Sequence, residues 1–84
     1  MKVMAKIGGR TTNIAQGPDG NLYVSDGGLP IITRLNALGE QKAFASHPDL
    51  LGTLGFIFDE DEQIFVASNI ITEKVLKIDL QGNI

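Results

Sequence analysis

Short runs of apolar and β-branched residues recur along the chain, and glycine, proline or acidic residues separate them. This pattern is typical of β-strands joined by tight turns. Helices are not favoured anywhere, because the runs are short and interrupted every few residues. The strands predicted by the pattern comprise residues 2–7, 12–17, 22–25, 31–36, 42–46, 54–59, 64–67 and 74–80.

The chain contains an internal repeat. Residues 19–25 (DGNLYVS) match residues 61–67 (DEQIFVA), half a chain length later. Residues 32–36 match residues 75–79 when one extra residue is allowed in the second copy. Each copy holds four predicted strands, and about 40–45 residues per four-stranded unit is the period of a β-propeller blade. The sequence therefore predicts an all-β chain with two four-stranded antiparallel blades.

These two blade repeats, at about residues 1–40 and 41–84, fill the chain of 84 residues. A chain this short buries only about 60–65% of its unfolded surface, and it has no cysteine with which to form stabilising disulfides. Propellers have about 4–8 blades, so two blades alone would leave sheet faces and strand edges open. We therefore expect the chain to act as part of a larger assembly.

Charge and hydropathy argue against two classes of partner. The net charge is -3 at pH 7, and the lysines and arginines are scattered singly, which disfavours binding to a nucleic-acid backbone. Lysines interrupt residues 1–7, so this segment contains neither a signal-peptide core nor a membrane span. We expect a soluble chain with no nucleic-acid or membrane partner. The compartment stays open, because either redox environment is compatible with a chain that lacks cysteine.

The segment GPDGNLYVSD at residues 17–26, followed by ITRL at 32–35, resembles the blade signature of NHL-repeat and SMP-30 (gluconolactonase-like) propellers. Residues 55–59 and 75–83 are similar to the same pattern, although Glu62 replaces the usual turn glycine. The resemblance covers nearly the whole chain and concerns the fold. It implies little about function, since the family includes lactonases, hydrolases, lyases and interaction modules on one scaffold.

The resemblance also implies an order of strands and a mode of assembly. The first strand of each copy would be an outer edge and the second would lie nearest the central channel, so the last blade would lack its outer strand. Residues 2–7 would then supply that strand to a neighbouring chain by β-augmentation. Three chains would close a six-bladed ring, so we expect a homotrimer with strand exchange. Two or four chains, or a chain cut from a longer propeller, remain open alternatives.

A metal site is not supported at the positions where metal-dependent lactonase-like relatives hold a divalent cation. Those positions align with Thr12 and Leu54, and leucine offers no donor to a cation that prefers six to eight oxygens. Asn13 would reach the channel only if the register slips. We expect no cofactor and no metal.

Several loop residues are candidates for binding a polar small molecule or peptide. The family arrangement places Arg10, Thr12, Asn13, Asp26, His47 and Asn69 on one face of the ring. His47 is the single histidine and has an ordinary pKa suited to acid–base work, but no nucleophile or second base accompanies it. Asp26 and Asn69 are equally well explained as caps of tight turns. The acidic residues 59–62 lack the spacing and glycine of an EF-hand loop, which favours a solvated hairpin.

No residue constellation amounts to a catalytic signature, so the hypothesis that we favour is a non-catalytic binding or interaction scaffold that assembles with copies of itself. The alternative is a lactonase, hydrolase or lyase whose site forms only in the assembled ring. A third hypothesis is an excised or engineered fragment, an intermediate of propeller evolution with no activity of its own, which would suit the clean repeat boundary.

Overall fold

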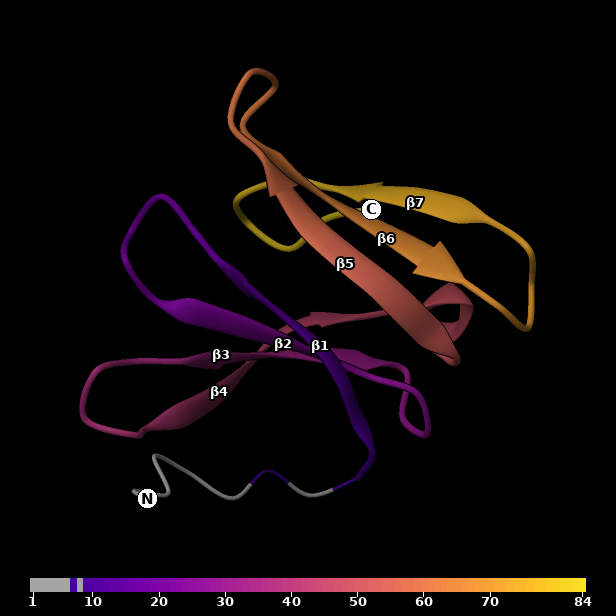
Figure 1. The fold of residues 1–84 in the computed structure, drawn as a ribbon, viewed down its shortest axis with the longest axis horizontal. Coiled ribbons are helices and arrows are strands. Elements are labelled where there is room, and N and C mark those ends of the chain that lie inside the picture. The colour runs from indigo at the N-terminus through magenta and orange to yellow at the C-terminus, as the bar shows by residue number, and fades with distance from the viewer. Residues whose placement is uncertain (1–6, 8) are drawn as a thin grey trace.

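The computed structural model describes residues 7 and 9–84, and within them the chain forms two antiparallel β-sheets (Figure 1). The first sheet has the strand order β1-β2-β3-β4 and the second has the order β5-β6-β7. A single-turn 3-10 helix, η1 (Pro48–Leu50), connects the two sheets. The strands are β1 (Thr11–Gln16), β2 (Leu22–Asp26), β3 (Ile31–Leu35), β4 (Gln41–Ser46), β5 (Thr53–Asp59), β6 (Ile64–Asn69) and β7 (Val75–Ile78).

The all-β prediction is confirmed, and each strand predicted within 9–84 is present with its ends shifted by at most two residues. The first sheet has the four strands predicted for a blade. β4 pairs with β3 as the outer strand of the first sheet, so among the described residues the second sheet has three strands and not four. This is the strand order that the propeller resemblance implied. The predicted strand at residues 2–7 lies outside the described residues apart from Ile7, which is not in a strand.

The 3-10 turn between the sheets was not predicted, although its local cause is visible in the sequence. Pro48 occupies its first turn, where a missing backbone N–H is tolerated. His47 precedes it in an extended conformation, and its Nδ1 accepts a hydrogen bond from the backbone N–H of Asp49. The turn carries Leu50, which is fully buried, into the core between the sheets.

The core lies between the two sheets and is rich in aromatic residues. Phe65 on β6 is fully buried, and its ring lies 4.5 Å from Tyr23, 4.9 Å from Phe58, 5.3 Å from Phe56 and 5.4 Å from Phe44, measured between ring centroids. Tyr23 and Phe44 belong to the first sheet, whereas Phe56 and Phe58 belong to β5. Offset and edge-on ring pairs at these distances add to the free energy gained by burial. The aromatic cluster therefore joins the two sheets into one unit.

Strand register shows where the two repeats differ in length. Thr11 pairs with Asp26 in the first sheet, and Thr53 pairs with Asn69 in the second. Counting inward from these pairs, Leu22 occupies the position of Phe65. The sequence match of residues 22–25 with 64–67 was therefore wrong by one residue. The extra residue of the second copy lies in the β5–β6 turn and not after β6.

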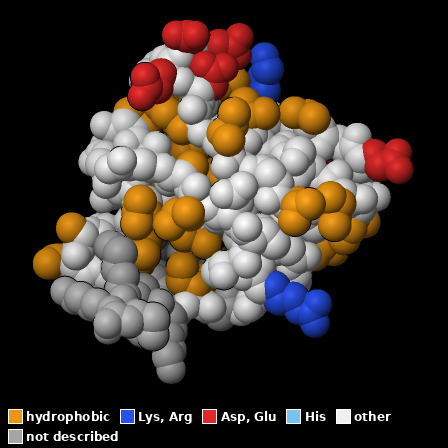
Figure 2. Space-filling model, in the orientation of Figure 1, with side chains coloured by type: hydrophobic (Ala, Val, Ile, Leu, Met, Phe, Trp, Pro, Cys, Tyr) orange, Lys and Arg blue, Asp and Glu red, His pale blue; other side chains and the backbone are white. Residues whose placement is uncertain are grey.

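The turn that contains this extra residue also has an unusual backbone. Gly20 has a φ of 82° in the β1–β2 turn, whereas in the β5–β6 turn the left-handed residue is Gln63, with a φ of 56°. The Gln63 side chain compensates in part, because its Nε2 donates a hydrogen bond to the carbonyl of Glu60 at 2.9 Å. Residues 59–62 form a solvated turn, in which Asp59 Oδ1 accepts from the N–H groups of Asp61 and Glu62. Acidic side chains gather at the tip of this hairpin (Figure 2).

Candidate functional site

Four loops meet at one end of the two sheets, on the right in Figure 1. They are the segment before β1, the β2–β3 loop, the β4–β5 connection with η1, and the β6–β7 loop. A backbone hydrogen bond from His47 N–H to the carbonyl of Pro30 (3.1 Å) joins the β4–β5 connection to the β2–β3 loop. A second one, from Ile70 N–H to the carbonyl of Gly52 (3.1 Å), joins the β6–β7 loop to the segment before β5. The propeller resemblance implied that the candidate binding residues lie at such a loop end.

Asp26 is buried at the end of β2, and its carboxylate is engaged by backbone donors. Oδ1 accepts hydrogen bonds from the N–H groups of Gly28 (2.7 Å) and Leu29 (2.9 Å), and Oδ2 accepts one from the N–H of Arg10 (3.1 Å). A carboxylate held by three backbone donors organises the loop in which it lies. The structure thus places Asp26 as the cap of the β2–β3 loop.

Asn69 is the counterpart of Asp26 in the second sheet and is also buried. Its Oδ1 accepts hydrogen bonds from the N–H groups of Ile71 (2.7 Å) and Thr72 (2.9 Å). Its Nδ2 donates to the carbonyls of Asp49 and Leu51. The amide is required here, because a carboxylate could not donate to those carbonyls. Asn69 thus fixes the β6–β7 loop and the segment around η1 at the same time.

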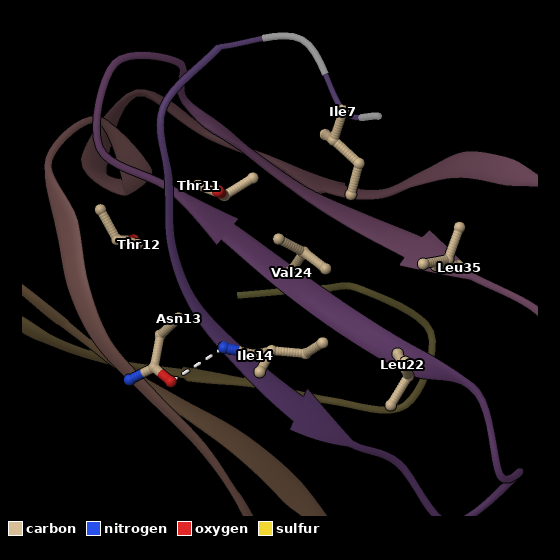
Figure 3. Close-up of a pocket in the computed structure, with 8 residues that line it drawn as sticks. All are labelled: Ile7, Thr11, Thr12, Asn13, Ile14, Leu22, Val24 and Leu35. Atoms are coloured by element: carbon tan, nitrogen blue, oxygen red, sulfur yellow. Dashed lines mark hydrogen bonds between the residues drawn. The ribbon is translucent and has the colours of Figure 1, made fainter. Parts of the chain in front are cut away.

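Thr12 connects the two sheets at the start of β1. Its Oγ1 donates to the carbonyl of Thr53 at 2.7 Å, and the same oxygen lies 2.8 Å from Ser25 Oγ. Since the one hydroxyl proton of Thr12 is used for that carbonyl, Ser25 is the donor in the second contact. Asn13 is exposed, and its Oδ1 accepts a hydrogen bond from the N–H of Ile14 (Figure 3). Leu54 is exposed at the start of β5 and carries no oxygen donor.

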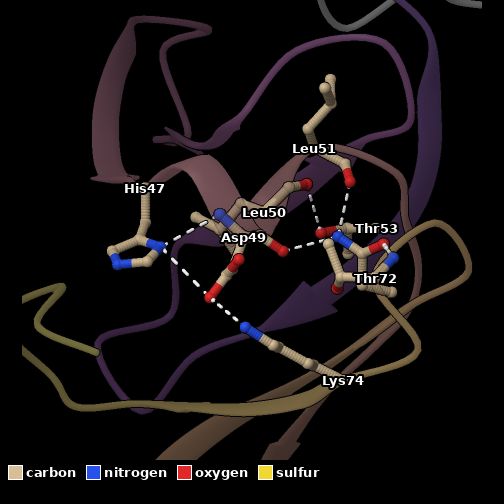
Figure 4. Close-up of polar contacts among 8 residues, drawn as sticks. His47, Asp49, Leu50, Leu51, Thr53, Thr72 and Lys74 are labelled. Atoms are coloured by element: carbon tan, nitrogen blue, oxygen red, sulfur yellow. Dashed lines mark hydrogen bonds and ion pairs between the residues drawn. The ribbon is translucent and has the colours of Figure 1, made fainter.

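His47 lies beside a pair of oppositely charged side chains (Figure 4). Its Nδ1 accepts from the N–H of Asp49 at 3.0 Å, so the neutral ring carries its proton on Nε2. Asp49 Oδ2 forms an ion pair with Lys74 Nζ at 3.1 Å. The His47 side chain is 43% exposed and lies 4.0 Å from the same carboxylate. The group could bind an anion or a polar ligand at the surface.

Arg10 is exposed at the loop end, and its backbone rather than its guanidinium contacts Asp26. The predicted site residues therefore share one end of the molecule without converging on one cavity. Among residues 7 and 9–84, no three His, Cys, Asp or Glu side chains are grouped in a way that could hold a metal ion. Over the same residues, no helix is long and apolar enough to cross a membrane.

Sequence reasoning missed a concavity of about 440 Å³ on the first sheet, on the face turned away from the second sheet. Figure 3 shows aliphatic side chains from β1, β2 and β3 directed into it, with Ile7 at its rim. The alternation of Leu22 and Val24 with Tyr23 and Ser25 would have indicated that this face is apolar. The concavity is lined by Ile7, Thr11, Thr12, Asn13, Ile14, Leu22, Val24 and Leu35.

Comparison with known proteins places the fold. The chain is similar to a catalytically inactive variant of virginiamycin B lyase from Staphylococcus aureus, solved with quinupristin, with a TM-score of 0.78 and 22% sequence identity over 93% of this chain and 26% of that one. A selenomethionine structure of virginiamycin B lyase from the same organism matches with a TM-score of 0.59 and 14% identity over 88% of this chain and 28% of that one. No protein-family model and no curated protein matches the chain.

These comparisons establish an all-β fold of two antiparallel sheets that resembles a fragment of a β-propeller. The chain spans about a quarter of the length of the structures it matches. The resemblance to NHL-repeat and SMP-30 propellers is not confirmed, since no family model matches. At these identities the likeness concerns the fold alone.

Proposed function

We propose that the chain is a two-blade propeller unit that assembles with copies of itself into a closed ring and serves as a non-catalytic binding scaffold. The observation that carries this proposal is the open edge of the second sheet. β4 covers the outer edge of β3 in the first sheet, whereas among residues 7 and 9–84 no strand covers the same edge of β7. An open strand edge is a template for pairing with another chain.

Residues 2–7 of a neighbouring copy would supply the missing outer strand by β-augmentation. The turn that leads towards this strand is already present. The turn after β3 has hydrogen bonds from Asn36 N–H to Glu40 O and from Gly39 N–H to Asn36 O, and the turn after β7 repeats both bonds between Asp79, Asn83 and Gly82. In the first sheet this turn leads directly into β4, which makes an outer strand beside β7 the natural continuation.

A homotrimer with six blades is the ring that we propose. The two blades of this chain cover 26% of the virginiamycin B lyase chain, so that chain has the length of about seven or eight such blades. Two-blade chains form rings with even numbers of blades, and six or eight blades both fall in the range that propellers use. Four copies with eight blades would be the next closed ring.

The ring would present the loop end of each unit on one face, and this is the surface that we propose binds a polar small molecule or peptide. Of the candidate binding residues, Arg10, Thr12, Asn13 and His47 are exposed or half-exposed there. Asp26 and Asn69 would shape the face through the loops that they hold and not by direct contact.

The absolute mass in solution, measured by light scattering behind size exclusion, tests the proposal. We expect three times the chain mass of 9.0 kDa, with or without a chelator. Val3→Pro should lower the mass because proline cannot donate to a strand ladder, whereas Val3→Thr should leave it unchanged. A monomeric wild-type chain would overturn the proposal.

One observation favours a second candidate, an enzyme whose site forms in the assembled ring. It is the likeness in fold to a lyase. The candidate residues would be Arg10, Asn13 and His47 from symmetry-related copies. Incubation of the assembled protein with quinupristin, followed by mass spectrometry, separates the two functions. A scaffold leaves quinupristin unchanged, while conversion that disappears in His47→Ala would establish the enzyme.

A further inference from the structure

Each sheet buries one face against the other sheet, and the opposite face of each sheet, its open face, does not contact the other sheet. On the first sheet this open face is only partly exposed, because Val24 and Leu35 beside the concavity are 7% and 4% exposed. The open face of the first sheet carries Ile14, which is 54% exposed, and contains the concavity described above. The open face of the second sheet carries Ile57 and Val75, which are 61% and 70% exposed. Exposed side chains of this size on a regular sheet are a surface suited to packing against another sheet.

The internal repeat makes these two open faces counterparts of the two faces that already pack together. In the register set by the Thr11–Asp26 and Thr53–Asn69 pairs, Ile14 corresponds to Phe56 and Leu22 to Phe65, and both phenylalanines are buried between the sheets. The open face of the first sheet is thus the repeat of the buried face of the second.

The same holds in the other direction. Tyr23 and Ile32 lie on the buried face of the first sheet, and the register places Val66 and Val75 at the corresponding positions of the second. Ile32 is fully buried, whereas Val75 is 70% exposed. The open faces of the two sheets therefore correspond to the two faces that pack together between the sheets.

From this correspondence, and resting on the self-assembly proposed above, we infer that copies of the chain pack head to tail through these open faces, repeating the contact between the first and second sheets. The open face of the second sheet of one copy packs against the open face of the first sheet of the next. The Tyr23–Phe65 contact, with ring centroids 4.5 Å apart, is then repeated as a contact of Val66 with Leu22 of the next copy.

The concavity fits this arrangement. Leu22 contributes to its wall. On the second sheet, the counterpart of Leu22 is Phe65, which receives the rings of Tyr23 and Phe44. A hollow on the first sheet is therefore expected where a side chain from the preceding copy enters. The contact joins different faces of two identical chains, so it is heterologous and forms a ring when the rotation closes.

Crosslinking between introduced thiols tests the inference directly, because the chain has no cysteine of its own. Leu22 and Val66 lie on opposite outer faces of the two stacked sheets, so a short bismaleimide cannot join Leu22→Cys and Val66→Cys within one chain. We expect the double variant to give covalent trimers. Each single variant alone should give only modified monomers, and an equal mixture of the two single variants should give dimers and nothing larger.

Charge substitution on the open face provides a second measurement that does not depend on crosslinking. Val75→Glu should raise the concentration at which the oligomer dissociates by tenfold or more, because a carboxylate would be buried in the contact between copies. Leu38→Glu is the matched control. Leu38 is 85% exposed in the turn between β3 and β4 and belongs to neither open face, so the oligomer of this variant should dissociate as the wild type does.

The outcomes separate this inference from the proposed assembly. Crosslinking of a single variant with itself, or an oligomer that resists Val75→Glu and forms no crosslink in the double variant, would show that copies associate without these faces. If residues 1–7 of the same chain covered the open face of the first sheet, the oligomer would resist Val75→Glu and the double variant would form no crosslink. A wild-type chain that is monomeric throughout would instead remove the proposed assembly itself.

Discussion

Replacement of Phe65 measures how far the aromatic cluster holds the two sheets together. Phe65 is fully buried and touches four other rings, two from each sheet. Phe65→Leu installs the residue that the first repeat carries at the corresponding position, Leu22. The substitution keeps an apolar side chain with good packing properties and removes the ring contacts.

The expected cost follows from those contacts. An aromatic pair contributes about 0.5–1.5 kcal/mol beyond its buried area, and contributions within one cluster are not additive. We therefore expect Phe65→Leu to lower the free energy of unfolding by about 2–3 kcal/mol. A domain of this length has about 4–13 kcal/mol of stability in total, so the variant should remain folded but weakened.

Urea unfolding followed by circular dichroism gives the measurement, repeated at several protein concentrations because assembly would add to the apparent stability. Phe58→Leu is the matched control, since Phe58 is half-buried and its one aromatic contact among the described residues is with Phe65, at 4.9 Å between ring centroids. It should cost less than about half as much. Equal costs, or a Phe65→Leu variant within about 0.5 kcal/mol of the wild type, would refute the view that Phe65 links the sheets.

Two further predictions concern the turns. Gly82 and Gly20 both have φ above 80°, but a Cβ at Gly82 would collide with the carbonyl oxygen of Phe44 on β4, whereas a Cβ at Gly20 meets open space. Gly82→Ala should therefore destabilise the chain by at least about 1 kcal/mol more than Gly20→Ala in thermal or urea unfolding, and equal losses would mean that the turn after β7 does not pack on β4. The second prediction concerns the hydrogen bond that Tyr23 Oη donates to Asp19 Oδ2 at 2.7 Å. Burial acts to raise the pKa of Asp19, but the hydrogen bonds from Tyr23 and Asn21 outweigh it and lower that pKa below its ordinary 3.8. Burial, with the Asp19 carboxylate, raises the pKa of Tyr23 above 10.0. The first shift stabilises the fold above pH 3.8 and is lost as pH falls through the lowered pKa; the second stabilises it below pH 10.0 and is lost as pH rises through the raised pKa. The stability difference between wild type and Tyr23→Phe should thus reach about 1 kcal/mol between these pH values and shrink at both ends, and a difference that does not vary with pH would contradict the assignment.

The strands could be predicted from the sequence because local signals agree with one another. Pro18, Asp19 and Gly20 lie between two predicted strands, at 12–17 and 22–25, and the structure has a turn there. The sheet to which 41–46 belongs could not be derived from pattern alone. The alternation of apolar and polar residues in 41–46 is compatible with either sheet. Backbone hydrogen bonds to β3 place this strand in the first sheet.

The one-residue error in the repeat alignment has a physical origin. Tyr23 and Val24 place apolar side chains on opposite faces of their strand, and Phe65 and Val66 do the same on theirs. Two alignments of the repeats, one residue apart, therefore give similar sequence matches. Only the pairing across the sheet distinguishes them. The same error concealed the equivalence of Asp26 and Asn69, although an Asp or Asn at the end of a strand, before a loop, is a typical loop cap.

The distribution of aromatic residues separates folding from assembly. All five aromatic side chains of the chain, four phenylalanines and one tyrosine, lie in the cluster between its two sheets. The corresponding positions on the open faces carry Ile14, Gln16, Leu22 and Val66. The contact within the chain is therefore stronger than the contact that we infer between copies, which lacks every aromatic pair. Because of that difference, we expect the two sheets of one chain to fold together first. Copies should then associate reversibly, to an extent that depends on the protein concentration.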